Sequence, residues 1–206
     1  MNTKKLNRVI HNNNVTQKIP KNIIKIVEFL DVNIPVNWDI YIQPFLNNLK
    51  PDIVLLNETK GIHIIECKSI IGDSFRRLKF ITREIKYLYC PRIALSEDPN
   101  DIKFPAIYTS HADLSLTSKE LDIAVKKIKY HPENFTTISS DFMKNDLKET
   151  FPLMFAEGKF NFSPKYAQDL RGWLNPSDFK IDYHEPLPML DKAQQALVER
   201  TTKQFL

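Results

Sequence analysis

The residues best suited to chemistry are two acids and a lysine beside two short apolar runs. Asp52 precedes the run 53–56, and Glu66 and Lys68 follow from the run 62–65. Side chains alternate between the faces of a strand, so Glu66 and Lys68 are expected on one face of the second strand. A turn between the runs would return Asp52 to the side of Glu66. The sequence therefore predicts two carboxylates and an ammonium group at the end of an apolar sheet.

These residue types suit the metal-dependent hydrolysis of phosphodiester bonds. Paired carboxylates with open coordination positions bind Mg²⁺ or Mn²⁺ through oxygen. Such an ion lowers the pKa of a bound water, while Lys68 would position or polarise that water. Burying three charges costs free energy unless they pair or bind a metal, so an ion pair between Glu66 and Lys68 in a purely structural domain is an alternative.

The periodicity of the apolar residues predicts the elements before this pair of runs. Residues 20–30 are apolar at helical spacing and predict a helix, and alternation over 36–43 predicts a half-buried strand. Asp39 lies on the polar face of that strand, so we expect it to face solvent and leave it out of the site. Residues 1–17 are polar and rich in asparagine, and we expect a loosely ordered arm or a short lead-in helix.

The later segments extend the sheet and cover it. A second amphipathic helix is expected with Asp73 or Ser74 as its cap. Strands are expected at 103–109 and 135–138, with a helix between them that opens on a capping box at 117–120. Because a strand, a helix and a strand in this order imply parallel pairing, the predicted fold class is α/β, with a central mixed sheet flanked by helices.

Four basic residues form a stripe on the second predicted helix, spaced three, four and three positions apart: Arg76, Lys79, Arg83 and Lys86. A basic stripe next to a metal site is suited to following the phosphate backbone of DNA. The alternative is that the stripe is the solvated face which any amphipathic helix carries.

The motif residues resemble the PD-(D/E)xK nuclease superfamily, whose pattern is matched by Pro51-Asp52 and by Glu66-Cys67-Lys68. The surrounding sequence, including Gln43-Pro44-Phe45, is similar to the nuclease-related domain that precedes superfamily-one DNA helicases. The resemblance implies a restriction-endonuclease-like fold and a Mg²⁺ or Mn²⁺ ion held by Asp52 and Glu66, with Lys68 as a catalytic residue. It also implies a glutamate from the first helix, matched by Glu28, although a solvated helix charge is the other interpretation.

The segment 190–198 resembles the adenine-reading segment that opens the motor of superfamily-one helicases, with Gln194 as the glutamine. The implied organisation is a nuclease-like domain over 1–149, a helical extension or linker over 150–186 and the beginning of a helicase motor over 187–206. We therefore expect the front portion of a nuclease–helicase that acts on DNA in phage defence or repair. A catalytically weak docking module that binds DNA is the alternative.

Composition limits the classes of protein and of binding site that the chain could represent. A chain of 206 residues that is 42% hydrophobic can bury a full core, and its formal charge of +4 must be clustered to matter for DNA. Two cysteines without a C-x-x-C spacing predict neither a zinc site nor a disulfide framework, which favours the cytoplasm. Four glycines are too few for a phosphate-binding loop, and no apolar run is long enough to span a membrane. His63 is expected to be a hydrogen-bonded core residue, and oligomeric state is not indicated.

Overall fold

A computed structural model describes residues 9–11, 19–44, 46, 49–86, 107–132, 134–158, 160 and 162–174. Within these ranges the strands form one six-stranded sheet in sequence order: β1 (Val9–His11), β2 (Trp38–Ile42), β3 (Ile53–Asn57), β4 (Gly61–Cys67), β5 (Ile107–Ala112) and β6 (Phe135–Ile138). Strands β2, β3 and β4 pair antiparallel, whereas β1 runs parallel to β2, and β4, β5 and β6 run parallel to one another. The predicted α/β class with a central mixed sheet is confirmed.

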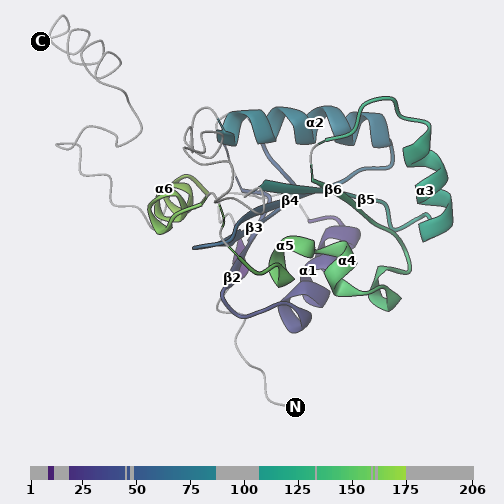
Figure 1. The fold of residues 1–206 in the computed structure, drawn as a ribbon. Helices are drawn as coiled ribbons and strands as arrows, with labels where there is room; N and C mark the ends of the chain where they lie inside the picture. The colour runs from purple at the N-terminus through teal and green to yellow at the C-terminus, as the bar shows by residue number, and fades with distance from the viewer. Residues whose placement is uncertain are drawn as a thin grey trace, which may run out of the picture.

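Helices cover both faces of this sheet: α1 (Lys21–Asn33), α2 (Ile71–Glu84), α3 (Ser118–Lys126), α4 (Leu147–Thr150), α5 (Pro152–Phe155) and α6 (Pro164–Leu174), with a 3-10 turn η3 (Phe142–Lys144). Helix α2 lies over one face, and α1, α4 and α5 lie against the other (Figure 1). The layers therefore sandwich the strands, so that a charged group on a central strand is shielded from solvent.

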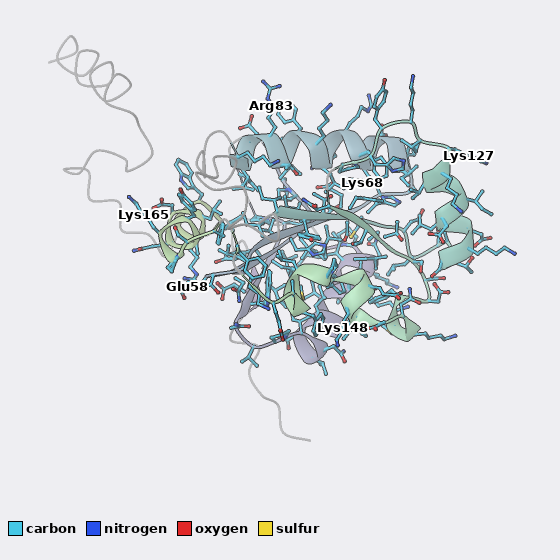
Figure 2. The ribbon with its side chains drawn as sticks, viewed as in Figure 1. Glu58, Lys68, Arg83, Lys127, Lys148 and Lys165 are labelled. Atoms are coloured by element: carbon cyan, nitrogen blue, oxygen red, sulfur yellow. The ribbon has the colours of Figure 1, made fainter. Side chains whose placement is uncertain are left out.

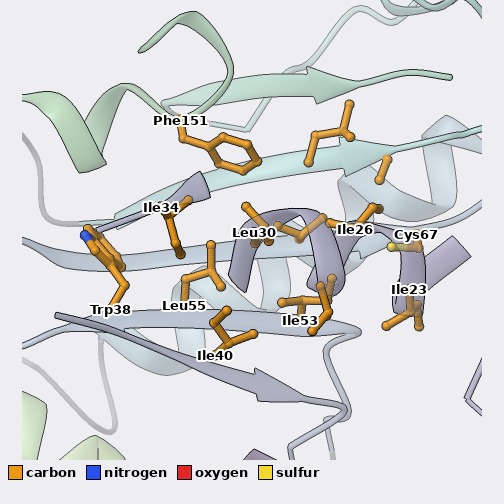
Figure 3. Packing of buried hydrophobic residues seen from close by; sticks show 14 of the residues in the cluster. Ile23, Ile26, Leu30, Ile34, Trp38, Ile40, Ile53, Leu55, Cys67 and Phe151 are labelled. Atoms are coloured by element: carbon orange, nitrogen blue, oxygen red, sulfur yellow. The ribbon is translucent and has the colours of Figure 1, made fainter. Parts of the chain in front are cut away.

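The α1-side core is the buried cluster between the sheet and α1, α4 and α5. It includes Ile26 and Leu30 of α1, Ile40 and Ile53 of the strands, and Phe151 before α5 (Figure 3). The α2-side core fills the other face with Val54 and Ile64 of the sheet, Leu78 and Ile81 of α2, and Leu170 of α6. Successive residues of β3 and β4 alternate between these cores, as the period of a strand requires.

The predicted hairpin forms between β3 and β4, and its loop explains the register. The Asn57 side-chain oxygen accepts hydrogen bonds from the backbone nitrogens of Thr59 and Lys60, at 3.0 and 2.9 Å. Gly61 then pairs with Asn57 and adopts a φ of 129°, a conformation that glycine reaches without steric cost. This closed turn holds Ile53 opposite Ile65, so the end of β4, where Glu66 lies, is beside the start of β3.

Two local predictions are confirmed. Thr117 and Glu120 form the expected capping box at the start of α3. The Glu120 carboxylate accepts a hydrogen bond from the Thr117 backbone nitrogen, and the Thr117 hydroxyl accepts one from the Glu120 backbone nitrogen. Strand β6 covers 135–138 and pairs parallel with β5 after the crossover through α3.

Other local predictions are wrong. The N-terminal arm contributes the strand β1, which pairs with β2. Strand β2 is covered on both faces instead of one, with Tyr41 only 2% exposed and Asp39 half-buried in an ion pair with Arg171 of α6. Helix α2 begins after Ile70, earlier than the predicted Asp73 or Ser74 cap, without a side-chain cap. For β1 and β2, pairing or packing from a distant segment supplies contacts that local periodicity does not reveal.

The predicted domain boundary after residue 149 stays a prediction. Residues beyond it are built into the main fold, since Phe151 and Leu153 are fully buried in the α1-side core and Leu170 in the α2-side core. Among the described helices, none is both long and apolar enough to cross a membrane.

Candidate functional site

Asp52 stands at the entrance to β3 and faces the helix α2. Val54 and Leu56 belong to the α2-side core, and period two places Asp52 on their face. Its Oδ2 accepts hydrogen bonds from the Cys67 backbone nitrogen at 2.8 Å and from Lys68 Nζ at 3.2 Å. The side chain is 7% exposed, so the carboxylate is held almost out of water by its neighbours at the end of β4 and just after it.

Glu66 lies at the end of β4 on the same face and is completely buried. Its Oε2 accepts a hydrogen bond from Arg77 Nε of α2 at 2.8 Å and lies 3.8 Å from Lys68 Nζ. Arg77 also donates from NH2 to the Lys50 carbonyl at 2.7 Å, which links α2 to the chain just before Asp52. The structure thus brings Asp52, Glu66 and Lys68 together as the sequence predicts, and adds Arg77 to them.

The positive charges near Glu66 do not fully compensate the cost of burying its carboxylate. Burial raises its pKa above the ordinary value of 4.5, and the nearby Asp52 charge raises it further. The hydrogen bond and charge of Arg77, and the charge of Lys68, oppose that rise without cancelling it. Glu66 Oε1 is buried and makes no hydrogen bond to any described residue. An ionised Glu66 therefore favours an additional cation or donor at this oxygen.

The donor set fits a hard divalent cation. Two carboxylates on one sheet face offer oxygen ligands, and the unpartnered Oε1 of Glu66 is the atom that such a cation would satisfy. Within the described ranges, no group of three or more His, Cys, Asp or Glu side chains could hold a metal ion. Any further ligands would have to be waters, backbone oxygens or phosphate oxygens, which is the manner in which Mg²⁺ is usually bound.

Glu28 is not brought to these groups in the described structure. It is exposed on α1, whose buried residues Ile23, Ile26 and Val27 pack in the α1-side core. Asp52 and Glu66 face the other way, toward α2. A place for Glu28 in a metal shell stays a prediction from the family resemblance.

The predicted basic stripe lies along α2 and its continuation. Arg76, Lys79 and Arg83 are exposed, and Lys86 is half-buried just beyond the helix. Figure 2 shows Arg83 on the outer side of α2, with Lys68 beneath the helix on the sheet side. Arg76 forms an ion pair with Asp73, one turn earlier.

Two hollows flank this stripe. The basic groove has a volume of about 770 Å³ and lies between α2 and the segment 128–132. A smaller hollow of about 470 Å³ is lined by Lys68 and Arg77 of the site, together with Arg76 and the half-exposed Phe80. Arg76 lines both hollows, so the candidate site and the groove adjoin each other on the surface.

Sequence reasoning missed Arg77 and the second wall of the groove. Arg77 directly precedes the buried Leu78 and so lies at the edge of the apolar stripe of α2. That position was the signal in the sequence that the Arg77 side chain turns toward the sheet. Lys129 and Tyr130 follow the end of α3 without any motif. Only the packing of that segment beside α2 makes them part of the groove, and no local pattern reports such packing.

Two buried histidines occupy the strands beside the site. His63 is hydrogen-bonded to Ser110 Oγ at 2.7 Å, and burial lowers its pKa to about 3, which confirms the prediction of a core histidine. His111 is the register partner of Glu66 on β5, and burial lowers its pKa to about 4 although Asp113 opposes the shift. Both rings are therefore neutral at physiological pH, and neither offsets the carboxylate charge.

The predicted adenine contact, Gln194, lies outside the described residues, as does the whole segment 175–206. No curated protein and no solved structure matches the sequence. Residues 1–166, which span every strand of the sheet, match the family of the MJECL32 domain. The chain belongs to the MJECL32 domain family.

Proposed function

We propose that the protein is a metal-dependent DNA nuclease of the PD-(D/E)xK type, acting in the cytoplasm as the nuclease portion of a nuclease–helicase in phage defence or repair. One observation carries the proposal. Asp52 and Glu66 lie on one sheet face, joined through Lys68, while a buried oxygen of Glu66 lacks a partner. A buried carboxylate left in this state is costly for stability and useful for binding a cation.

The roles of the residues follow from their contacts. A Mg²⁺ or Mn²⁺ ion bound to Asp52 and Glu66 would supply Lewis-acid stabilisation of the phosphate and a more acidic water. Lys68 is 36% exposed and lines the smaller hollow, so its ammonium group can donate to a phosphate oxygen or to the attacking water. Arg77 fixes the Glu66 carboxylate through its Nε, and it anchors to the Lys50 carbonyl.

A second candidate is the docking module that binds DNA without cutting it. The observation in its favour is the Arg77–Glu66 ion pair, because Arg77 and Lys68 balance the formal charge of the two carboxylates. Under this alternative the four charges are a structural cluster, and the basic stripe of α2 is the functional surface.

Cleavage of defined DNA substrates separates the two candidates. Supercoiled plasmid, linear duplex and single-stranded circles are incubated with the protein and Mg²⁺ or Mn²⁺. We expect cleavage that requires the metal, that is lost in Asp52→Asn, and that falls about 100-fold or more in Lys68→Ala. Cutting of closed circles would identify an endonuclease.

The matched controls are Lys148→Ala and Glu149→Gln, since both residues are exposed on α4. Figure 2 shows Lys148 on the other side of the sheet from Lys68 and α2. Both controls should cleave at the wild-type rate. Cleavage that survives in Asp52→Asn would contradict the assignment of Asp52 to the active site. The absence of cleavage with either metal, while DNA is still bound, would favour the docking module instead.

A further inference from the structure

The groove beside α2 has two walls of different origin. One wall is α2 itself, which contributes Arg76, Lys79 and Arg83. The other is the segment that follows α3, which contributes Lys129 and Tyr130. Basic residues therefore face the same space from both sides, which a solvated helix face alone would not produce.

The second wall is held in place by aromatic packing. The His131 ring lies 5.5 Å from the Phe75 ring of α2 and 6.3 Å from the Phe135 ring of β6, measured between centroids. Phe75 and Phe135 also meet each other edge to face at 4.6 Å. These contacts connect both walls to the sheet, so the separation between α2 and the segment 128–132 is set by the fold.

Part of the positive charge of the groove is uncompensated. Lys79 and Arg83 are exposed, and among the described residues no ion pair joins either of them to an acidic side chain. Lys129 Nζ lies 5.5 Å from the centroid of the Tyr130 ring, which places an aromatic surface and a cation side by side. Tyr130 is 75% exposed. A large aromatic side chain left in solvent within a basic groove is suited to a ligand that is both planar and anionic.

We propose that this groove binds single-stranded DNA, with a base stacked on Tyr130 and the phosphates along the cations of α2. The choice of DNA rests on the proposed nuclease function. The choice of a single strand rests on Tyr130, because the faces of paired bases inside a duplex are already stacked and only an unpaired base can meet the ring. From Arg76 to Lys86 the stripe runs about 15 Å along α2 and its continuation, one line of cations suited to one backbone.

The groove leads along α2 toward the candidate site. Arg76 lines both the groove and the smaller hollow that contains Lys68. A strand lying along α2 with its phosphates on Lys79 and Arg83 therefore passes Arg76 to reach Lys68. Tyr130 and the basic stripe would then act as a positioning surface for the strand that is cut.

Fluorescence anisotropy with labelled oligonucleotides tests this inference without any catalysis, because EDTA removes the divalent ions. We expect the wild type to bind a single strand of mixed sequence more tightly than the same sequence as a blunt duplex. Tyr130→Ala should weaken binding of the single strand about tenfold and change duplex binding little. Tyr130→Phe keeps the stacking surface and should bind like the wild type.

Charge reversal tests the phosphate contacts. Lys79→Glu should weaken binding and reduce the slope of log affinity against log salt by about 0.7 for the lost phosphate contact. The control Lys148→Glu makes the same change of charge on α4 and should leave both quantities unchanged. Single-strand binding unchanged in Tyr130→Ala, or Lys148→Glu weakening it as much as Lys79→Glu, would overturn the proposal.

The two proposals fail separately. If a single strand binds through Tyr130 but no metal supports cleavage, the nuclease proposal fails and the groove stands. If DNA is cut through Asp52 and Lys68 while Tyr130→Ala binds normally, the groove proposal fails and the nuclease stands.

Discussion

Glu66 is a buried carboxyl whose surroundings do not fully compensate its charge. Its carboxyl is fully buried, yet the partners that surround it leave one oxygen unpaired and its pKa raised. Arg77 and Lys68 supply positive charge, and Asp52 adds repulsion. An ionised Glu66 is therefore less stable in the folded protein than in the unfolded chain, a situation that a bound cation would reverse.

The raised pKa of Glu66 predicts how stability depends on pH. Below about 4.5 the carboxyl is protonated in both the folded and unfolded states, and its contribution to stability is fully present. As pH rises through the raised folded-state pKa, the unfolded chain has already lost its proton and stability falls. The neutral variant Glu66→Gln lacks this loss. We expect the Tm of the wild type minus that of Glu66→Gln, measured without metal, to decrease as pH rises above 4.5.

The control for this measurement is Glu149→Gln, which removes an exposed carboxylate on α4. Its Tm difference from the wild type should stay nearly constant over the same pH range. A difference for Glu66→Gln that is equally flat would show that Arg77 and Lys68 compensate the buried charge completely.

The core of the site could be predicted from the sequence because it depends on short-range geometry. Period two places Glu66 and Lys68 on one face, and a hairpin must return Asp52 to their side. Arg77 and Tyr130 reach their places through the packing of α2 on the sheet and of the segment 128–132 beside α2. That information lies in contacts between distant elements, which the spacing of neighbouring residues does not contain.

At the scale of elements, the β3–β4 hairpin determines whether the site forms. Elements with a strong local pattern could be predicted, because the burial of α1 repeats at helical spacing and β3 and β4 are continuously buried runs. The short strand β1 could not, since it exists through pairing with β2 and carries only three residues. The β3–β4 hairpin is one of the elements that could be predicted, and its register depends on Gly61.

Gly61 adopts a φ of 129°, which a residue with a Cβ reaches only under strain. We therefore expect Gly61→Ala to lower the free energy of unfolding by about 1–3 kcal/mol, measured by urea denaturation. Cleavage should fall as well if the strain shifts Glu66 relative to Asp52. Circular dichroism of the folded variant checks that the fold persists.

Gly72 provides the matched control. It lies in the first turn of α2, and a Cβ built there meets nothing within 4 Å. Gly72→Ala should be neutral or slightly stabilising, because alanine favours the helix. Equal destabilisation by the two substitutions would mean that the turn at Gly61 is not the source of the cost.

At the scale of the whole molecule, two cores share one sheet. The α1-side core contains Trp38, which is fully buried, and the α2-side core contains Leu170 of α6. Arg171 of α6 also pairs with Asp39 of β2, with Nε and Oδ2 2.9 Å apart. These contacts tie α6 to the sheet, so we expect the described elements to unfold as one cooperative unit.

The two tryptophans of the sequence report on the two sides of the sheet. In Trp38→Phe, the remaining Trp173 reports on α6, and in Trp173→Phe, the remaining Trp38 reports on the α1-side core. For each variant, the fluorescence transition in urea should coincide with the transition seen by far-ultraviolet circular dichroism. An earlier fluorescence transition of Trp173 alone would show that α6 is an independent extension.

Direct binding of Mn²⁺ tests whether Asp52 and Glu66 together hold a metal. Electron paramagnetic resonance measures the free ion in a titration with wild type, Asp52→Asn, Glu66→Gln and the control Glu149→Gln. We expect the wild type and control to bind one ion with equal affinity, more tightly as pH rises and Glu66 loses its proton. Each site variant should bind at least about tenfold more weakly. Equal binding by all four proteins, or no binding by the wild type, would show that Asp52 and Glu66 do not form a metal site.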